Sequence, residues 1–148
     1  MKKNIQIQRE DFDVSDEIEA LGDDAAGAVA SFVGIVRGGD GLTALTLEHY
    51  PGMTEREIAQ IVEQAQARWT LITGITVIHR IGRLSVGERI VLVAVASAHR
   101  QSAFEACEFL MDYLKTRAPF WKQEERGGQT AWVEHRASDD AAAERWRR

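Results

Sequence analysis

The sequence predicts an α+β protein with antiparallel sheets. Segments with the alternating or continuous apolar pattern of strands come in pairs, and glycine-containing turns join most of them. Two amphipathic segments with helical spacing separate the pairs, in the order ββ-α-ββ-α-ββ. Hairpin turns join antiparallel strands, whereas a parallel nucleotide-binding sheet needs a crossover between successive strands. We therefore expect a single domain over residues 1–148.

The chain is expected to begin with a short strand and a brief helix. Ile5 and Ile7 alternate with polar residues, which is typical of a half-buried strand. The hydroxyl of Ser15 can cap a helix that Gly22 ends, because serine satisfies free amides and glycine readily turns the chain.

A nearly continuous apolar stretch follows at 26–37, as expected for a strand that is covered on both faces. Gly34 within it indicates a bulge or a close approach of another backbone. The glycine-rich turn at 38–41 then predicts a hairpin with a second strand at 42–47.

The middle of the chain reads as a helix followed by two strands. Thr54 and Glu57 fit a capping box, in which a hydroxyl and a carboxylate satisfy the first free amides. The helix is expected to end before Gly74. Strands follow at 75–81 and 89–96, joined by a glycine-containing connection. The expected buried face of the helix consists of Ile58, Ile61, Val62 and Ala65.

A third helix carries the clearest pattern in the sequence. Ser102 and Glu105 fit a second capping box, and Pro119 predicts that the helix stops near Arg117. One face has the i, i+3, i+4 spacing of a buried stripe. Its members are Ala103, Ala106, Cys107, Leu110, Met111 and Leu114.

The C-terminal segment is expected to form a last hairpin and a loose tail. Strands at 120–124 and 130–134 flank the pair Gly127–Gly128, which suits a tight turn. The charged, alanine-rich tail at 139–148 is expected to be a frayed surface helix.

Composition points to an ordinary globular protein with an uneven distribution of cations. The formal net charge is -5, with 45% apolar and 28% charged residues, which argues against a general nucleic-acid binder. Lys115, Arg117, Lys122 and Arg126 nevertheless lie close together in the sequence. This grouping suits a small anionic ligand better than a polymer.

The cysteine content and the absence of long apolar runs indicate a cytoplasmic location. Cys107 is the only cysteine, so one chain cannot form an internal disulfide. Its place on the apolar helix face favours a buried side chain over a nucleophile. The N-terminus lacks a signal-peptide core, and no stretch has membrane-spanning length.

Two groups of residues flank the third helix and form a candidate anion site. His99 and Arg100 precede the helix, where free amides and the dipole favour an anion. Lys115, Arg117 and Lys122 crowd around its other end. The alternative is structural, because cations in the last turn of a helix are common dipole partners.

Other kinds of site find little support in the sequence. The histidines at 49, 79, 99 and 135 lack the spacing of metal ligands, and hydrogen-bonded structural roles are expected for His49 and His79. An RNA-stacking platform would need aromatic residues and cations on one sheet face, but Trp121 and Lys122 are adjacent in a strand.

Three runs of the sequence closely resemble a known family. SAHRQSAFEACEFLMDYLKTRAPFWK, LTLEHYPGM and TVIHRIG are similar to motifs of the large, catalytic subunit of molybdopterin synthase. The likeness extends from about Val29 to Asp139, with the motifs in the expected order. It implies an α/β-hammerhead core with antiparallel strands, two main helices and a small added β-subdomain.

The resemblance implies a sulfurtransferase that acts with a partner. Members of this family bind cyclic pyranopterin monophosphate and insert two sulfurs, which form the dithiolene of molybdopterin. The sulfur arrives as a thiocarboxylate on the C-terminal Gly-Gly of a small ubiquitin-like carrier subunit. The implied assembly is a homodimer with two carriers, a heterotetramer. No cofactor, metal, nucleic acid or membrane is implied.

The resemblance also implies the site residues. Lys115 and Lys122 match the two lysines that are regarded as central to catalysis. Arg136 matches an arginine that reaches the pocket of a neighbouring subunit, and Phe32 matches a pocket aromatic, although a buried strand phenylalanine needs no such role. The positions implied in substrate binding are Ile35, Val36, Arg37, His99, Arg100, Lys115, Lys122, Gln123, Glu124 and Arg136.

One alternative to the enzyme is a non-catalytic adaptor that binds an anion or a nucleotide on the same fold. Such an adaptor would not need both Lys115 and Lys122. A second alternative, an RNA-binding module, is disfavoured by the net charge of -5.

Overall fold

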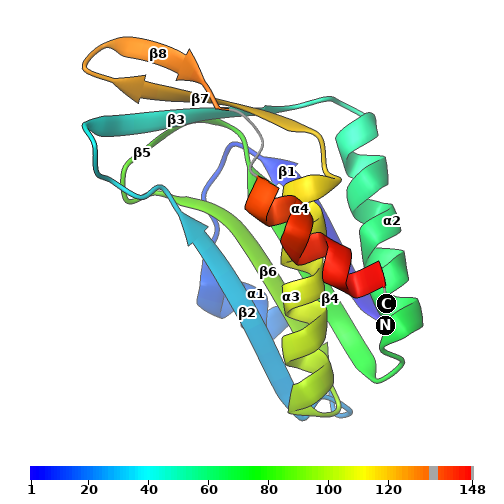
Figure 1. Ribbon diagram of the computed structural model, residues 1–148. Helices are drawn as coiled ribbons and strands as arrows, with labels where there is room; N and C mark the ends of the chain where they lie inside the picture. The colour runs from blue at the N-terminus through cyan, green and yellow to red at the C-terminus, as the bar shows by residue number, and fades with distance from the viewer. Residues whose placement is uncertain (134–136, 148) are drawn as a thin grey trace.

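The computed structural model describes residues 1–133 and 137–147, and within that part the chain forms two four-stranded sheets with helices packed against them (Figure 1). The α+β class is thus confirmed. The first sheet contains, in spatial order, β1 (Lys2–Gln8), β4 (Ile72–Arg80), β6 (Arg89–Ser97) and β2 (Ala28–Ile35). The second contains β5 (Gly82–Ser85), β3 (Leu42–His49), β7 (Phe120–Arg126) and β8 (Gln129–Trp132).

The expected hairpin between β2 and β3 is wrong, because the two strands belong to different sheets. β2 pairs with β6, and β3 pairs with β5 and β7. The turn at 38–41 instead carries the chain from one sheet to the other. The backbone of Val36, just after β2, bonds to Glu88 and Gly87 and so remains beside the β5–β6 turn.

Two further strand predictions need correction. The glycine-containing connection expected after β4 includes a strand of its own, β5, which pairs with β3. β1 pairs in parallel with β4, from Lys2 opposite Gly74 to Gln8 opposite Arg80, whereas only antiparallel strands were expected. The long segment between β1 and β4 gives the chain the length that a parallel pairing requires.

Gly34 occupies the irregularity that the sequence predicted in β2. The pairing register with β6 shifts between Gly34 and Ile35, as at a bulge. A Cβ atom on Gly34 would lie 2.8 Å from a side-chain carbon of Val91, so a larger residue would require that side chain to shift. The expected bulge is therefore present, and the close neighbour is a side chain, not another backbone.

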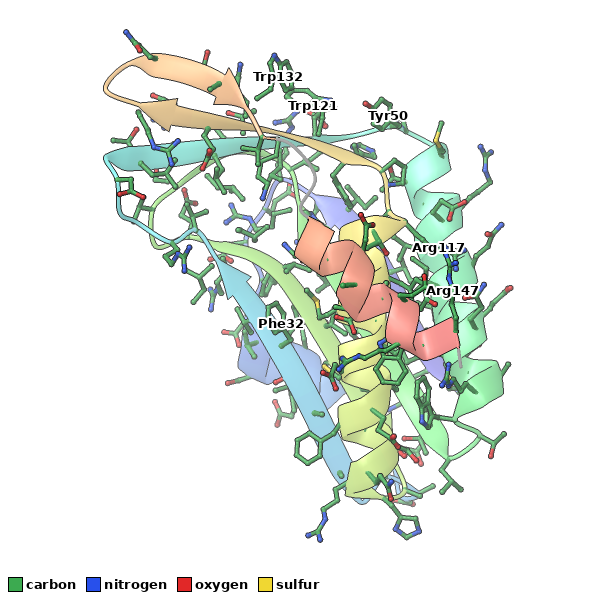
Figure 2. All side chains as sticks on the ribbon, in the orientation of Figure 1. Phe32, Tyr50, Arg117, Trp121, Trp132 and Arg147 are labelled. Atoms are coloured by element: carbon green, nitrogen blue, oxygen red, sulfur yellow. The ribbon has the colours of Figure 1, made fainter. Side chains whose placement is uncertain are left out.

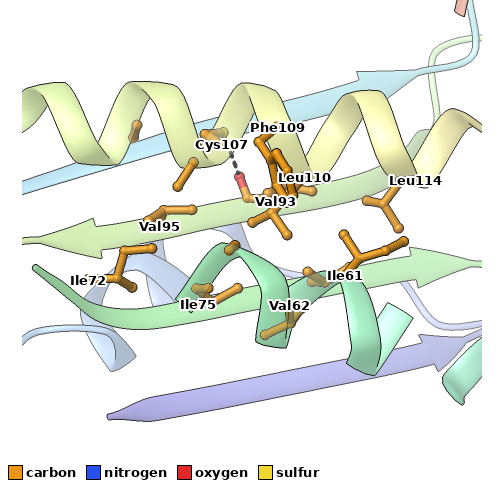
Figure 3. Packing of buried hydrophobic residues seen from close by; sticks show 14 of the residues in the cluster. Ile61, Val62, Ile72, Ile75, Val93, Val95, Cys107, Phe109, Leu110 and Leu114 are labelled. Atoms are coloured by element: carbon orange, nitrogen blue, oxygen red, sulfur yellow. Dashed lines mark hydrogen bonds between the residues drawn. The ribbon is translucent and has the colours of Figure 1, made fainter. Parts of the chain in front are cut away.

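Two long helices cover one face of the first sheet, α2 (Met53–Arg68) and α3 (Arg100–Thr116) (Figure 1). Figure 3 shows their buried side chains meeting those of β4 and β6, with the Cys107 thiol directed at the Val93 carbonyl at 3.8 Å. The short helix α1 (Val14–Ala20) lies with its flanking residues in a separate cluster that includes Phe12 and Leu21. No helix within the described residues is long and apolar enough to cross a membrane.

The caps of the first two helices differ from those expected. Asp13, not Ser15, caps α1, with its carboxylate accepting from the Asp16 amide at 3.0 Å. Gly52 is the N-cap of α2, and its amide donates to the Glu55 carboxylate at 2.9 Å.

The start of α3 also differs from the prediction. The helix begins at Arg100, with His99 at the N-cap, so Ser102 lies inside the first turn. The predicted end is confirmed, because the helix stops at Thr116 and Arg117 caps it before Pro119. The six residues predicted for the buried stripe all pack into or against the core.

The C-terminal tail contacts α3, whereas a frayed helix was expected. It forms α4 (Ala137–Glu144) and a short 3₁₀ helix (Arg145–Arg147) that lies over α3 (Figure 1). The Trp146 ring packs edge-on against Trp69 and Phe109, at centroid distances of 5.7 and 5.6 Å. Its indole N–H donates to the Asp112 carboxylate at 2.6 Å, so apolar burial and a hydrogen bond both hold the tail.

Candidate active site

A cavity of about 620 Å³ lies between the end of β2, the second sheet and the C-terminal half of α3. Its volume is in the range of small-molecule sites. The wall combines apolar side chains with cations and carboxylates. The polar and charged residues that line it are Arg37, His79, Lys115, Lys122, Glu124 and Asp139.

Strand β7 contributes alternate residues to the cavity. Phe120, Lys122 and Glu124 line it, which follows from the two-residue period of a strand. Gln123 does not line it, although it was expected to bind substrate. Trp121 also lies outside the wall and packs edge-on against Trp132 at 4.8 Å between ring centroids (Figure 2). Lys122 and Trp121 thus face opposite sides of the sheet, as the RNA argument assumed.

Helix α3 and strand β2 supply the other cations. Lys115 is one helical turn after Met111, and both residues line the cavity. Arg37 lies two residues beyond the end of β2, and Ile35 lines the cavity beside it. Phe32 belongs to the wall as well and is 41% exposed, so it is not the buried strand residue expected.

Several positions implied by the resemblance do not reach this cavity. Val36 is only 1% exposed and packs in a small cluster with Leu45, Leu47 and Leu84. His99 and Arg100 lie at the opposite end of α3 from Lys115. Fifteen residues of helix separate Arg100 from Lys115, which corresponds to about 20 Å. Arg136 lies outside the described residues.

Carboxylates and one histidine modify the charge of the cavity. Glu124 forms an ion pair with Arg126 at 3.1 Å. Burial, with a smaller contribution from the nearby Lys115 and Lys122, lowers the pKa of His79 to about 4. His79 is therefore uncharged at neutral pH, and the cavity keeps its excess of cations. No group of three or more His, Cys, Asp or Glu residues in the described part of the chain could hold a metal ion.

Cys107 is no candidate nucleophile in the described site. Burial raises the pKa of its thiol to about 11, which leaves the unreactive protonated form at neutral pH.

His79 is the cavity residue that sequence reasoning assigned to a structural role. A signal was present in β4, where Ile75 and Val77 alternate on the face that packs against the helices. His79 continues this alternation and so places a polar ring at the end of an apolar stripe. At the end of β4, His79 stacks on Phe120, the first residue of β7. The sequence alone does not show that β7 lies beside this end of β4.

Comparisons with known proteins show the family of the chain. Residues 7–117 match the family described as MoaE protein. A molybdopterin synthase catalytic subunit from Mesorhizobium japonicum is 57% identical, and the match covers 97% of this chain and 92% of that protein. A molybdopterin cofactor biosynthesis protein E from Burkholderia multivorans has a TM-score of 0.85 at 47% identity, covering 99% and 97% of the two chains.

A more distant structure shows the fold alone. It is a complex of subunits 1 and 2 of the molybdopterin-converting factor from Helicobacter pylori, with a TM-score of 0.76 at 22% identity, covering 89% of this chain and 91% of that chain. The family match spans most of the sequence and the identities are high over nearly full lengths. The chain therefore belongs to the MoaE protein family.

Proposed function

We propose that this chain is the catalytic subunit of a molybdopterin synthase. It transfers two sulfurs to cyclic pyranopterin monophosphate from the C-terminal thiocarboxylate of a small carrier subunit. The observation that carries the proposal is the convergence of Arg37, Lys115 and Lys122, from three separate elements, on one cavity. A non-catalytic adaptor would not need both lysines at the same cavity.

The chemistry accounts for the three cations. The substrate carries a phosphate, and the planar guanidinium of Arg37 suits its oxygens. Attack at a thiocarboxylate or its acyl derivative places negative charge on oxygen, which the ammonium groups of Lys115 and Lys122 stabilise. The apolar side chains of the wall strengthen this attraction, because they lower the local dielectric constant around the charges.

The carrier delivers its sulfur on a C-terminal Gly-Gly tail. Glycines allow the backbone of the tail to enter a narrow channel where side chains would not fit. Lys115 is exposed at the cavity, so its ammonium group can meet the terminal thiocarboxylate. The Helicobacter pylori structure is itself a complex of two subunits, which supports a protein partner for this fold. Removal of the last two carrier residues should abolish tight binding in calorimetry, and equal affinity would contradict the channel.

The complete site is shared by two copies of the chain. Arg100 lies about 20 Å along α3 from Lys115, a distance that a pterin-sized ligand and two long side chains could barely bridge within one subunit. A two-fold dimer would bring His99 and Arg100, with Arg136, towards the lysines of the other copy, and each contact would occur twice. Two carriers then complete a heterotetramer. We place this assembly in the cytoplasm, where the single free cysteine stays reduced.

The test is reconstitution of the reaction. Purified protein is incubated with thiocarboxylated carrier and cyclic pyranopterin monophosphate, and molybdopterin is measured. Carrier with an ordinary C-terminal carboxylate is the control, because it brings no sulfur. Molybdopterin formed with thiocarboxylated carrier, and not with carboxylate carrier, supports the proposal. If carrier whose thiocarboxylate has been verified gives no molybdopterin, the proposal is contradicted.

A further inference from the structure

The hydrogen bond of His79 fixes which ring nitrogen carries the proton. Its Nδ1 lies 2.8 Å from the backbone carbonyl oxygen of Arg80. A carbonyl can only accept, so Nδ1 must be the donor and carry the proton. In the neutral ring the lone pair then resides on Nε2.

The ring is also held in place by stacking. Its centroid lies 3.8 Å from that of Phe120, with only 17° between the planes. Phe120 and His79 both line the cavity, as does Lys122, two residues along the same strand as Phe120. The ring therefore lines the cavity in an orientation that it cannot leave without breaking these contacts, with its lone pair on Nε2.

The surroundings keep this ring uncharged at neutral pH, so the lone pair on Nε2 is available to accept a proton. Burial lowers the pKa of His79 to about 4, while its bond to Arg80 acts in the opposite direction. The charged or titratable groups that oppose protonation are Lys115 on α3, Lys122 on β7 and His49 on β3. An anion bound between the lysines would offset their repulsion and make protonation of the ring easier.

The proposed reaction needs a base. The inference that follows rests on the proposed function. Sulfur transferred from a carrier thiocarboxylate remains bonded to the acyl carbon until that bond is broken. When water breaks this bond, the carrier ends as a carboxylate that has gained one oxygen from the water. Water is a poor nucleophile at neutral pH unless a base removes its proton.

We propose that His79 is the general base that activates the water which releases the carrier from the acyl–sulfur intermediate. The water oxygen bonds to the acyl carbon while Nε2 takes one water proton. The carbon–sulfur bond then breaks with its electron pair on sulfur, and the imidazolium returns the proton to that sulfur. The balance is acyl–S–substrate plus water giving carrier carboxylic acid plus substrate thiol.

The other candidate bases in the described wall are carboxylates. Glu124 forms an ion pair with Arg126 at 3.1 Å. Asp139 lies in the first turn of α4 and lines the cavity. His79 differs from both because its bond to Arg80 assigns the lone pair to one defined nitrogen, Nε2.

The test follows the intermediate directly. His79→Gln is mixed in a single turnover with thiocarboxylated carrier and cyclic pyranopterin monophosphate, and carrier species are resolved by intact-mass spectrometry. The variant should accumulate a covalent carrier–substrate species whose hydrolysis is slowed by about 10²-fold or more, the usual contribution of a general base. His79→Phe, which keeps the stacking and lacks the acceptor, should behave in the same way.

His49→Gln is the matched control. His49 contacts Glu48 and Glu55 at 3.2 and 3.7 Å and does not line the cavity, so this variant should release the carrier like the wild type. Thermal melting and carrier affinity establish that each His79 variant is folded and binds. If the wild type forms product and folded His79→Gln hydrolyses the carrier–substrate species at the wild-type rate, the role of His79 as a base is overturned and the proposed function stands. Absence of product from the wild type overturns the proposed function itself.

Discussion

The Thr54 hydroxyl donates a 2.7 Å hydrogen bond to the carbonyl of Pro119 and so links the start of α2 to the residue before β7. The same oxygen accepts from the Tyr50 amide at 3.0 Å, and Thr54 is fully buried. The bond fixes the point where the chain leaves α3 and enters the strand that carries Lys122. A threonine expected to cap a helix thus connects the start of α2 to the segment that leads into β7.

Thr54→Val should destabilise the fold and weaken catalysis. The change keeps the shape but leaves the Pro119 carbonyl and the Tyr50 amide without their partner, which costs about 1–3 kcal/mol. Urea unfolding measures this loss. Thr54→Ser keeps the hydroxyl and should recover most of the stability. If Thr54→Val and the wild type unfold at the same urea concentration, the structural role of this hydrogen bond is contradicted.

Lys115→Ala and Lys122→Ala should each retain the fold and lose most product formation. Lys115 is exposed and Lys122 is partly exposed, and changes at such positions usually alter stability by less than about 0.5 kcal/mol. Melting curves and molybdopterin formation separate the two effects. Lys3→Ala, at an exposed position on β1, is the control and should behave like the wild type. Wild-type turnover by either cavity variant would refute the assignment.

The contrast between α3 and the β2–β3 segment shows what the sequence could predict. The buried stripe of α3 depends on spacing within one helix, and Ala106 and Leu110 are indeed fully buried. The pairing of β2 depends instead on which distant strand offers a better partner. A turn-like sequence at 38–41 cannot reveal that β6 is that partner, because strand pairing is a non-local property.

In the candidate site, too, the sequence could predict features that depend on local spacing and could not predict those that depend on the packing of distant elements. The residues of β7 could be placed by alternation once one of them was known, which would have excluded Gln123 and retained Glu124. His79 could not be placed beside Phe120, since the two are brought together only by the packing of both sheets. The separation of Arg100 from Lys115 was predictable from helix geometry and is confirmed.

Asp11 should contribute stability that disappears in acid. Two hydrogen bonds from Arg89, at 2.8 and 3.0 Å, lower the pKa of the Asp11 carboxyl from 3.8 to about 2. Because the folded-state pKa is lowered, the contribution is present above the unfolded pKa and is lost as the pH falls from about 4 towards 2. The side chain is 51% exposed, so solvent screening limits the contribution to less than about 1 kcal/mol.

Urea unfolding of Asp11→Asn and the wild type between pH 7 and pH 2 measures this contribution. The stability difference should be constant near neutral pH and shrink below pH 4. Asp24→Asn, at an exposed position between α1 and β2, should show no such difference. A difference for Asp11→Asn that persists unchanged at pH 2 would contradict the Arg89 linkage.

The shared site predicts that two inactive variants complement each other. Arg100 and Lys115 lie at opposite ends of α3, so a dimer-built site takes one from each copy. Lys115→Ala and Arg100→Ala should each form inactive homodimers. In a mixed dimer, one site combines both intact residues while the other carries both defects. With random exchange about half of the dimers are mixed, so activity should reach roughly one quarter of the wild-type value.

Exchange is verified with differently tagged variants before activity is measured, and sedimentation should show a dimer without carrier. A mixture of Lys115→Ala with Lys122→Ala is the matched control. These two residues line the cavity of the same chain, so no mixed site contains both and activity should stay low. Two results would show that the two ends of α3 do not serve one site. One is recovered activity in this control mixture, and the other is no recovered activity when Lys115→Ala is mixed with Arg100→Ala and exchange is verified.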